Sequence, residues 1–355
     1  MVDLAKKHAN VVTLLLAFIA INIVNQHVSG DPFREGKLIV FLFAALFGAS
    51  VWIANRFNLF LGLTVMIAAA EWAYANGPLF GIVPVVGCVG FLYLGHLASQ
   101  NEQLILLLLR ASTIIQLVFC AFQMFGHQCF GGINPYFNWM LFGNLGHPIV
   151  LSAWMAAIAP LAYFYWSRVE FLIICAVCLY SGSTMGVMAL VAGGAYVWWR
   201  RLGWPVMAAG ILGFIALSFC VWRFPEVEFF SLSGRLLPWR RAVFWILQSP
   251  WVGYGPGSWS GMYHRWGVEY AREWSPMHSD ALQLAFEIGL PGFLLFITGI
   301  YMILRKCSVA YGAVMSSLLI NGVGAFPFHI PELAFVFCTC LSMKDEGEKI
   351  WNGLK

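Results

Sequence analysis

The sequence predicts an all-α polytopic membrane protein of about twelve transmembrane helices, with one long outer loop between spans nine and ten. Of the 355 residues, 61% are hydrophobic and only 10% are charged, whereas soluble domains carry roughly 25% charged residues. No linker of low complexity interrupts the apolar segments, so we expect a single integral membrane domain over residues 1–355. The formal net charge of +4 is dispersed along the chain, and we therefore expect no nucleic-acid partner.

Apolar runs recur along the chain at lengths close to the thickness of a bilayer. A spanning helix needs roughly 17–25 predominantly apolar residues. The runs near this length are residues 9–26, 38–55, 58–76, 79–98, 103–125, 147–166, 169–182, 184–199, 204–222, 280–304, 308–325 and 328–343. The break between the seventh and the eighth run is placed at the small polar residues Ser181 to Thr184.

Lysine and arginine are unevenly divided between the two predicted sides. Cytoplasmic loops of membrane proteins carry an excess of these residues. If the N-terminus is cytoplasmic, the inner loops and the C-terminal tail hold Lys6, Lys7, Arg56, Arg168, Arg200, Arg201, Arg305, Lys306, Lys344, Lys349 and Lys355. The opposite short loops hold only Arg34 and Lys37. Both termini are therefore predicted to be cytoplasmic.

Residues 224–277 form the only long charged connection, and they lie on the predicted outer side. Five arginines fall in this loop: Arg235, Arg240, Arg241, Arg265 and Arg272. The stretch 238–247 is amphipathic enough to form a helix on the membrane face. The glycines of residues 253–257 predict an elbow whose backbone can approach a ligand closely.

Three segments, at residues 143–154, 234–259 and 278–292, together resemble the bacterial O-antigen ligase and O-antigen polymerase family, membrane glycosyltransferases that use polyprenyl-diphosphate-linked glycans. "GRLLPWRRAVFWILQSPWVGYGPGSW", residues 234–259, looks like the family's Arg-x-x-x-Trp segment running into Pro-x-x-Gly-x-Gly. "HSDALQLAFEIGLPG", residues 278–292, is similar to its His-Asn-x-x-Leu-Gln-x-x-x-Glu-x-Gly-x-x-Gly. "GNLGHPIVLSAW", residues 143–154, is a fainter echo of its Gly-x-x-x-Asn-Pro.

Two positions depart from the family's pattern. Ser183-Thr184 stands where the family often has Ser-Arg, so one expected phosphate-binding arginine is missing. Ser279 stands where the family usually has Asn. Either the diphosphate is held differently, for example by Arg240 or Arg272, or the activity of this member is altered.

The resemblance implies transfer of a glycan from undecaprenyl diphosphate to a sugar hydroxyl acceptor in cell-surface polysaccharide assembly, that is, O-antigen and lipopolysaccharide biosynthesis. We slightly favour a ligase, whose acceptor is a lipid A-core sugar, over a polymerase, whose acceptor is the growing glycan. A protein oligosaccharyltransferase is also similar in this region. The resemblance further implies a multi-pass protein of the bacterial inner membrane, surrounded by membrane lipids, with loop 224–277 and the active site in the periplasm. It implies no cofactor and no metal.

One residue is the candidate catalytic group, and four are candidates for substrate binding. These are His278 as the catalytic residue, with Arg235, Arg240, Arg272 and Glu287 as substrate-binding residues. An imidazole suits proton abstraction near pH 7, and we expect it in the first turn of a helix, where the helix dipole keeps it neutral. A guanidinium forks onto phosphate oxygens, although an outer-loop arginine can also bind lipid headgroups. Glu287 could pair with an arginine. No His, Asp or Glu cluster has metal-ligand spacing, so we expect a metal-independent enzyme.

Two residues outside the loop are also considered. Arg110 lies inside the fifth span, where a charge is a functional candidate by default, although we favour a side chain that snorkels to the interface. His147 begins the sixth span on the outer side and could line the same cavity as His278.

A transporter of lipid-linked glycans, such as a flippase, is the main alternative to an enzyme. Transporters usually show internal repeats and broken helices around charges at the midplane. In this chain the polar residues gather in one outer loop instead, which favours the enzyme. A non-catalytic scaffold protein is a third interpretation.

Overall fold

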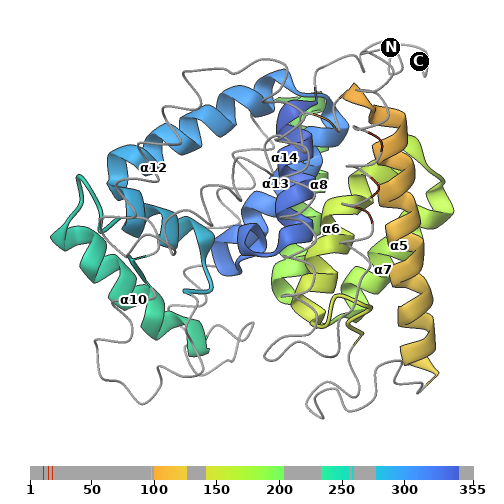
Figure 1. Ribbon diagram of the computed structural model, residues 1–355, viewed down its shortest axis with the longest axis horizontal. Helices are drawn as coiled ribbons and strands as arrows, with labels where there is room; N and C mark the ends of the chain where they lie inside the picture. The colour runs from red at the N-terminus through yellow and green to blue at the C-terminus, as the bar shows by residue number, and fades with distance from the viewer. Residues whose placement is uncertain are drawn as a thin grey trace.

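The computed structural model describes residues 101–125, 141–203, 233–255 and 277–343, together with residues 11, 15, 18, 97, 100, 258 and 259. Within these residues the protein is helical and contains no strand. In chain order the elements are α5 (Glu102–Met124), α6 (Pro148–Tyr165), α7 (Arg168–Tyr180), α8 (Thr184–Leu202), α10 (Ser233–Gln248), α12 (Asp280–Lys306), α13 (Val309–Gly324), the 3-10 turn η4 (Pro327–His329) and α14 (Pro331–Ser342) (Figure 1).

The all-α class is confirmed for the part of the chain that the structure describes. Each predicted span that falls there is a helix, namely the runs at 103–125, 147–166, 169–182, 184–199, 280–304, 308–325 and 328–343. By length and composition, α5, α6 and α12 could cross a membrane, and α13 and α14 are shorter apolar helices. The predicted spans at 9–26, 38–55, 58–76, 79–98 and 204–222 lie outside the described residues, apart from single positions. The total of about twelve spans stays a prediction.

The predicted break between the seventh and eighth runs is confirmed. Helix α7 ends at Tyr180 and α8 begins at Thr184. The hydroxyl of Ser183 accepts a hydrogen bond from the backbone N–H of Gly186 at 3.3 Å, which caps the N-terminus of α8. The residues that replace the family's Ser-Arg therefore start a helix.

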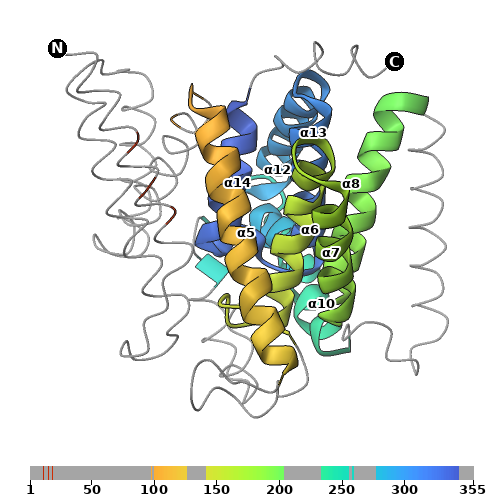
Figure 2. The ribbon, with the colours of Figure 1, turned by 90° about the vertical axis from the view of Figure 1, so that its right-hand side faces the viewer.

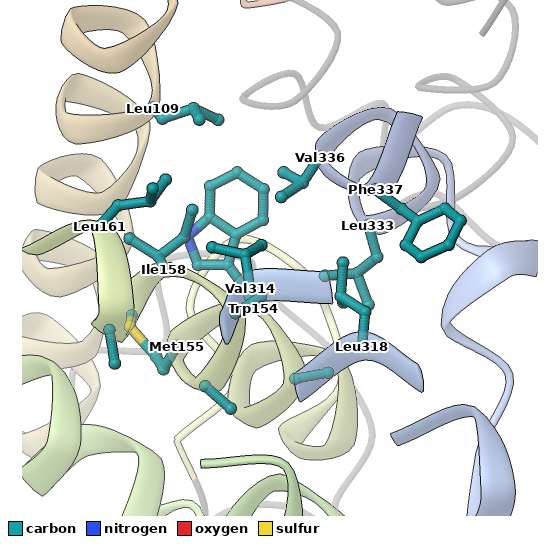
Figure 3. Packing of buried hydrophobic residues seen from close by; sticks show 14 of the residues in the cluster. Leu109, Trp154, Met155, Ile158, Leu161, Val314, Leu318, Leu333, Val336 and Phe337 are labelled. Carbon is teal, nitrogen blue, oxygen red and sulfur yellow. The ribbon is translucent and has the colours of Figure 1, made fainter. Parts of the chain in front are cut away.

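Helix α6 lies at the centre of the bundle, with α5, α7, α8 and α13 packed against it (Figure 2). Its many alanines let neighbouring helices approach closely. Trp154 on α6 is fully buried, and its indole Nε1 donates to the hydroxyl of Thr113 on α5 at 3.3 Å. Figure 3 shows Trp154 between Leu109 of α5, Val314 of α13 and Val336 of α14. This core packs the central helices together, and α12 in turn contacts α13 of this core.

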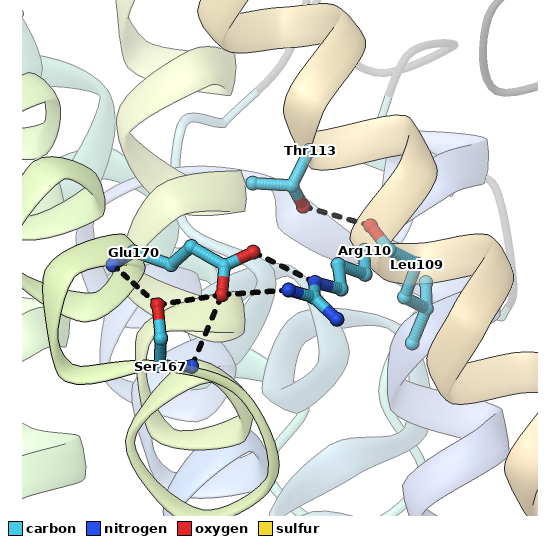
Figure 4. A network of polar contacts seen from close by, with 5 residues as sticks. All are labelled: Leu109, Arg110, Thr113, Ser167 and Glu170. Carbon is cyan, nitrogen blue, oxygen red and sulfur yellow. Dashed lines mark hydrogen bonds and ion pairs between the residues drawn. The ribbon is translucent and has the colours of Figure 1, made fainter.

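Arg110 joins α5 to the beginning of α7. Its Nε and Nη2 donate to the two carboxylate oxygens of Glu170 at 2.7 and 3.1 Å (Figure 4). The same carboxylate accepts from the backbone N–H of Ser167 and completes the capping box of α7. The Arg110 side chain is 45% exposed, so the pair adds only about 0–1 kcal/mol to stability. These contacts favour the interfacial interpretation of Arg110 over a role in the site.

Helix α12 is kinked at Gly289, within the predicted span at 280–304. Gly289 has φ 71° and ψ 171°, which are not helical values. The turn after α10, residues 249–255, rests on this kink (Figure 1). Three backbone hydrogen bonds join the two segments: Tyr254 N–H to Phe286 O at 3.0 Å, Gly255 N–H to Glu287 O at 2.9 Å and Leu290 N–H to Pro250 O at 2.7 Å. The kink's backbone groups are thus satisfied by the turn.

The close approach expected at the glycine elbow is made to another backbone. A Cβ on Gly253 would lie 2.5 Å from the carbonyl oxygen of Glu287, and a Cβ on Gly289 would lie 2.7 Å from that of Trp251. Both glycines also have positive φ. The glycines of the turn after α10 and of the α12 kink therefore pack backbone against backbone, and this contact holds α10 against α12.

We expect Gly289→Ala to destabilise the protein by about 1–3 kcal/mol, because alanine at positive φ is strained and its Cβ meets backbone. Gly299→Ala is the matched control on the same helix, since a Cβ there meets nothing within 4 Å. A helix-interior glycine replaced by alanine stabilises by roughly 0.5–1 kcal/mol. Thermal unfolding of both variants in detergent measures the difference. Equal melting temperatures would contradict the role of Gly289.

Candidate active site

Helix α10 begins earlier than the predicted helix at 238–247. It covers Ser233–Gln248, so Arg235 lies in its first turn. One face packs on α12 through the buried side chains of Ala242 and Ile246. The opposite face exposes Val243, Phe244 and Leu247, which fits the predicted position on the membrane face.

Arg235 is buried at the C-terminal end of α13. Its side chain has only 5% of its surface exposed, and its Nη1 donates to the carbonyl oxygen of Gly324. A helix C-terminus carries partial negative charge, which stabilises a guanidinium there. Burial lowers the pKa of Arg235, but arginine keeps its charge at neutral pH. A headgroup-binding arginine would lie on the lipid-facing surface, so this position disfavours that alternative.

Trp239 ties α10 to the segment before α12. It lies four residues after Arg235, on the same face of the helix. Its indole Nε1 donates to the carbonyl oxygen of Met277 at 3.1 Å. This bond places Arg235 and His278 at the same end of the α10–α12 pair.

His278 precedes α12 instead of lying in its first turn, which corrects the sequence expectation. Ser279 is the N-cap of α12, and its hydroxyl accepts from the N–H of Leu282 at 3.2 Å. Asparagine is an equally good N-cap, so the Ser279 departure from the family preserves the start of the helix. His278 itself has φ 52°, in the left-handed region that few non-glycine residues adopt.

His278 is neutral at pH 7 for a different reason from the helix dipole. Burial first, then the charge of Arg235 and then an electrostatic interaction with His147, lower the pKa of His278 to about 4. The edge of its ring contacts Phe326, with ring centroids 5.0 Å apart. His147 caps α6, and its Nδ1 accepts from the N–H of Ile149 at 3.1 Å. The electrostatic effect of His147 agrees with the expectation that it lies near His278.

Asp280 binds a second histidine that sequence reasoning missed. Its Oδ1 lies 2.6 Å from Nδ1 of His329, and its Oδ2 accepts from the backbone N–H of Phe328 at 2.8 Å. The predicted span at 328–343 would place His329 within a helix, but η4 ends at His329 and α14 begins at Pro331. Prolines at 327 and 331 could have revealed this break in the sequence, because proline favours a helix start and interrupts a helix interior.

Glu287 lies on the same side of α12 as two other polar residues, Asp280 and Gln283. Its Oε1 accepts from Nε2 of Gln283 at 3.0 Å, and Nε2 of Gln283 also lies 3.4 Å from Nε2 of His329. Asp280, Gln283 and Glu287 are separated by three and four residues, so they share one face of the helix. The structure therefore connects Glu287 to the Asp280–His329 pair through Gln283.

Of the remaining predicted substrate-binding arginines, Arg240 is described by the structure and is not brought to Arg235. Arg240 is exposed, and a spacing of five residues places it on a different face of α10. Arg272 lies outside the described residues. Within the described ranges, no group of three His, Cys, Asp or Glu side chains is placed to hold a metal ion.

Residues 169–297 match the family model described as O-antigen ligase. The match begins in α7 and ends in α12, so it includes Arg235, the glycine turn and His278. A comparison with curated proteins gave no match. The match supports the family resemblance that the sequence motifs predict, and residues 169–297 are similar to the O-antigen ligase family.

Proposed function

We propose that this protein transfers a glycan from undecaprenyl diphosphate to a sugar hydroxyl at the periplasmic face of a bacterial inner membrane. The O-antigen ligase match supports glycan transfer in polysaccharide assembly. The observation that carries the proposal is the buried Arg235, which the bond from Trp239 to Met277 places at the same end of the α10–α12 pair as His278. A fixed cation beside a neutral imidazole suits a reaction that expels a diphosphate and removes a hydroxyl proton.

In this proposal Arg235 binds the diphosphate. The guanidinium has five N–H donors in a planar fork, and Gly324 holds it through Nη1. Its orientation is therefore fixed before substrate binds, so little reorganisation is needed as negative charge develops on the leaving group. Because Arg240 lies on another face of α10, we propose no role for it at the same phosphate.

His278 accepts the proton of the acceptor hydroxyl. The hydroxyl oxygen attacks the anomeric carbon, the bond from that carbon to the diphosphate breaks, and the proton moves to the imidazole. A bound diphosphate offsets the charge of Arg235, which is one cause of the low pKa of His278. Donor binding should therefore raise the pKa of His278 toward the operating pH, where a general base is most effective.

The acceptor distinguishes a ligase from a polymerase, and we slightly favour the ligase, with a lipid A-core sugar as acceptor. A deletion strain tests this through its surface and lipid-linked glycans. Loss of all polymer from lipopolysaccharide supports a ligase, and lipopolysaccharide capped with a single repeat supports a polymerase. An unchanged glycan profile would overturn the proposed function.

We expect activity to survive chelation, because Arg235 supplies the positive charge that a divalent ion would otherwise provide. Purified protein assayed with its lipid-linked donor in excess EDTA should keep its turnover. Loss of activity in EDTA that is restored by a divalent ion would contradict a metal-independent mechanism.

A further inference from the structure

We propose that Asp280, Gln283, Glu287 and His329, here called the polar row, form a subsite for the hydroxyl groups of a sugar. The proposal rests on the proposed function, since it supplies a place for a glycan beside His278. The row begins two residues after His278 and continues along one face of α12, with His329 added from η4.

The polar row is held in place by its own hydrogen bonds. Asp280 is buried, and its backbone N–H donates to Ala325 O at 3.1 Å. Its carboxylate contacts both Phe328 N–H and the His329 ring, which fixes the orientation of that ring. Asp280 is therefore a positioning residue, and His329, Gln283 and Glu287 are the groups offered to a ligand.

The outer part of the row is accessible. The His329 side chain is 44% exposed, and Gln283 and Glu287 are half-buried. The exposed positions farther along α12 are mostly apolar, with Thr298 and the terminal Arg305 and Lys306 as polar exceptions. The apolar ones are Leu290, Leu294, Leu295, Ile297, Tyr301 and Met302. Charged side chains in a spanning helix face the bundle interior or a water-filled space, because contact with hydrocarbon is costly. The exposure of the His329 side chain favours a water-filled space for this row. The polar row therefore lines such a space, while the apolar positions suit lipid.

The hydrogen-bonding groups of the row match sugar hydroxyls. In the neutral tautomer that donates from Nδ1 of His329 to Asp280, Nε2 of that ring is an acceptor, and the Gln283 amide can donate toward it and toward Glu287. The row thus presents one donor, the Gln283 amide, between two acceptors, Nε2 of His329 and the carboxylate of Glu287. A sugar hydroxyl both donates and accepts, and it can replace the long 3.4 Å contact between Gln283 and His329.

The charge of the row argues against a diphosphate ligand. Asp280 and Glu287 carry carboxylates, which repel an anion, whereas the cation of the site is Arg235. Uncharged hydroxyls of the acceptor sugar or of the donor's glycan fit the row equally in chemical terms. The kinetic test separates these two sources.

The test uses Glu287→Gln and His329→Ala in the full-length protein, with Thr298→Ala as the control. Thr298 is an exposed polar residue of α12 that bonds only its own helix, at Leu294 O, among the described residues. The probes are lipid-linked glycan as donor and lipopolysaccharide without polymer as acceptor, each titrated at saturating levels of the other. Loss of one hydrogen bond to a charged group should raise one KM about tenfold, with a smaller change in kcat.

A raised acceptor KM assigns the subsite to the acceptor, and a raised donor KM assigns it to the donor's glycan. Unchanged values for both substrates in folded variants would overturn the subsite. Glu287→Gln keeps the shape of the side chain, so melting temperatures near wild type are expected.

Binding without turnover keeps this inference distinct from the proposed function. Saturation-transfer NMR with the repeat-unit oligosaccharide, freed of lipid and diphosphate, should give a signal with wild type that falls in Glu287→Gln. If wild type transfers no glycan but shows this pattern, the function fails and the subsite stands. If wild type transfers glycan but the variants match it in KM and in NMR signal, the subsite fails and the function stands.

Discussion

Arg235→Lys is expected to lower turnover about 10²–10³-fold, the effect of removing one fixed donor from a developing negative charge. Lysine keeps the positive charge but has no planar fork. In the native protein one nitrogen of the guanidinium holds the carbonyl of Gly324 while the group stays buried. An ammonium cannot keep this orientation and also bind two phosphate oxygens in a bidentate manner. Turnover per folded molecule, with undecaprenyl-diphosphate glycan as substrate, measures the loss.

Arg110→Lys is the matched control for this experiment. Arg110 also makes a two-bond contact with its partner, but that partner is Glu170 at the N-terminus of α7. This substitution also replaces a planar guanidinium by an ammonium, but at a position outside the candidate site, so turnover should stay near wild type. Wild-type turnover in Arg235→Lys would remove the diphosphate role from Arg235 and leave it a purely structural bond to α13.

The apolar helices were predictable from sequence because each is long, continuous and bounded by polar or small residues. The break at Ser181 to Thr184 and the kink at Gly289 were also predictable, since serine caps helices and Gly-x-Pro interrupts them. Helix α10 was predicted too short at its start, because only the stretch 238–247 was judged by its amphipathic pattern, whereas the helix begins at Ser233. That error hid the burial of Arg235.

The second histidine could not be found by reading segments one at a time. Asp280 and His329 are 49 residues apart, and their contact depends on how η4 folds back over the start of α12. The Glu287–Gln283–His329 connection depends on the same long-range placement. The low pKa of His278 also arises from tertiary burial and from Arg235, whereas the sequence suggested only a helix dipole.

His278→Asn is expected to lower kcat about 10²–10⁴-fold, the usual contribution of a general base. Asparagine is preferred to alanine for this test because His278 has φ 52°. A left-handed backbone costs most residues roughly 1–2 kcal/mol, but asparagine adopts it readily. The variant should therefore keep its melting temperature and its binding of lipid-linked donor. Lost stability with near-normal turnover per folded molecule would identify His278 as structural.

The pH dependence of stability gives an independent check on the state of His278. Its pKa is about 4 in the folded protein and near 6.5 when unfolded. The unfolded chain therefore takes up a proton that the folded protein does not, and stability falls as the pH drops from 6.5 toward 4. His278→Asn removes this contribution, so its melting temperature should fall less than that of wild type in this window and in parallel with it above pH 6.5.

The pH dependence of kcat/KM tests the base directly, because this quantity reports groups of the free enzyme. With a pKa of about 4, the acid limb of wild type should lie near pH 4 and the profile should be flat through neutral pH. Arg235→Gln removes the charge that, after burial, most lowers the pKa of His278, so the limb should move upward. Arg235→Lys keeps the charge and should leave the limb in place while turnover falls. An acid limb that does not move in Arg235→Gln would mean that another group takes the proton.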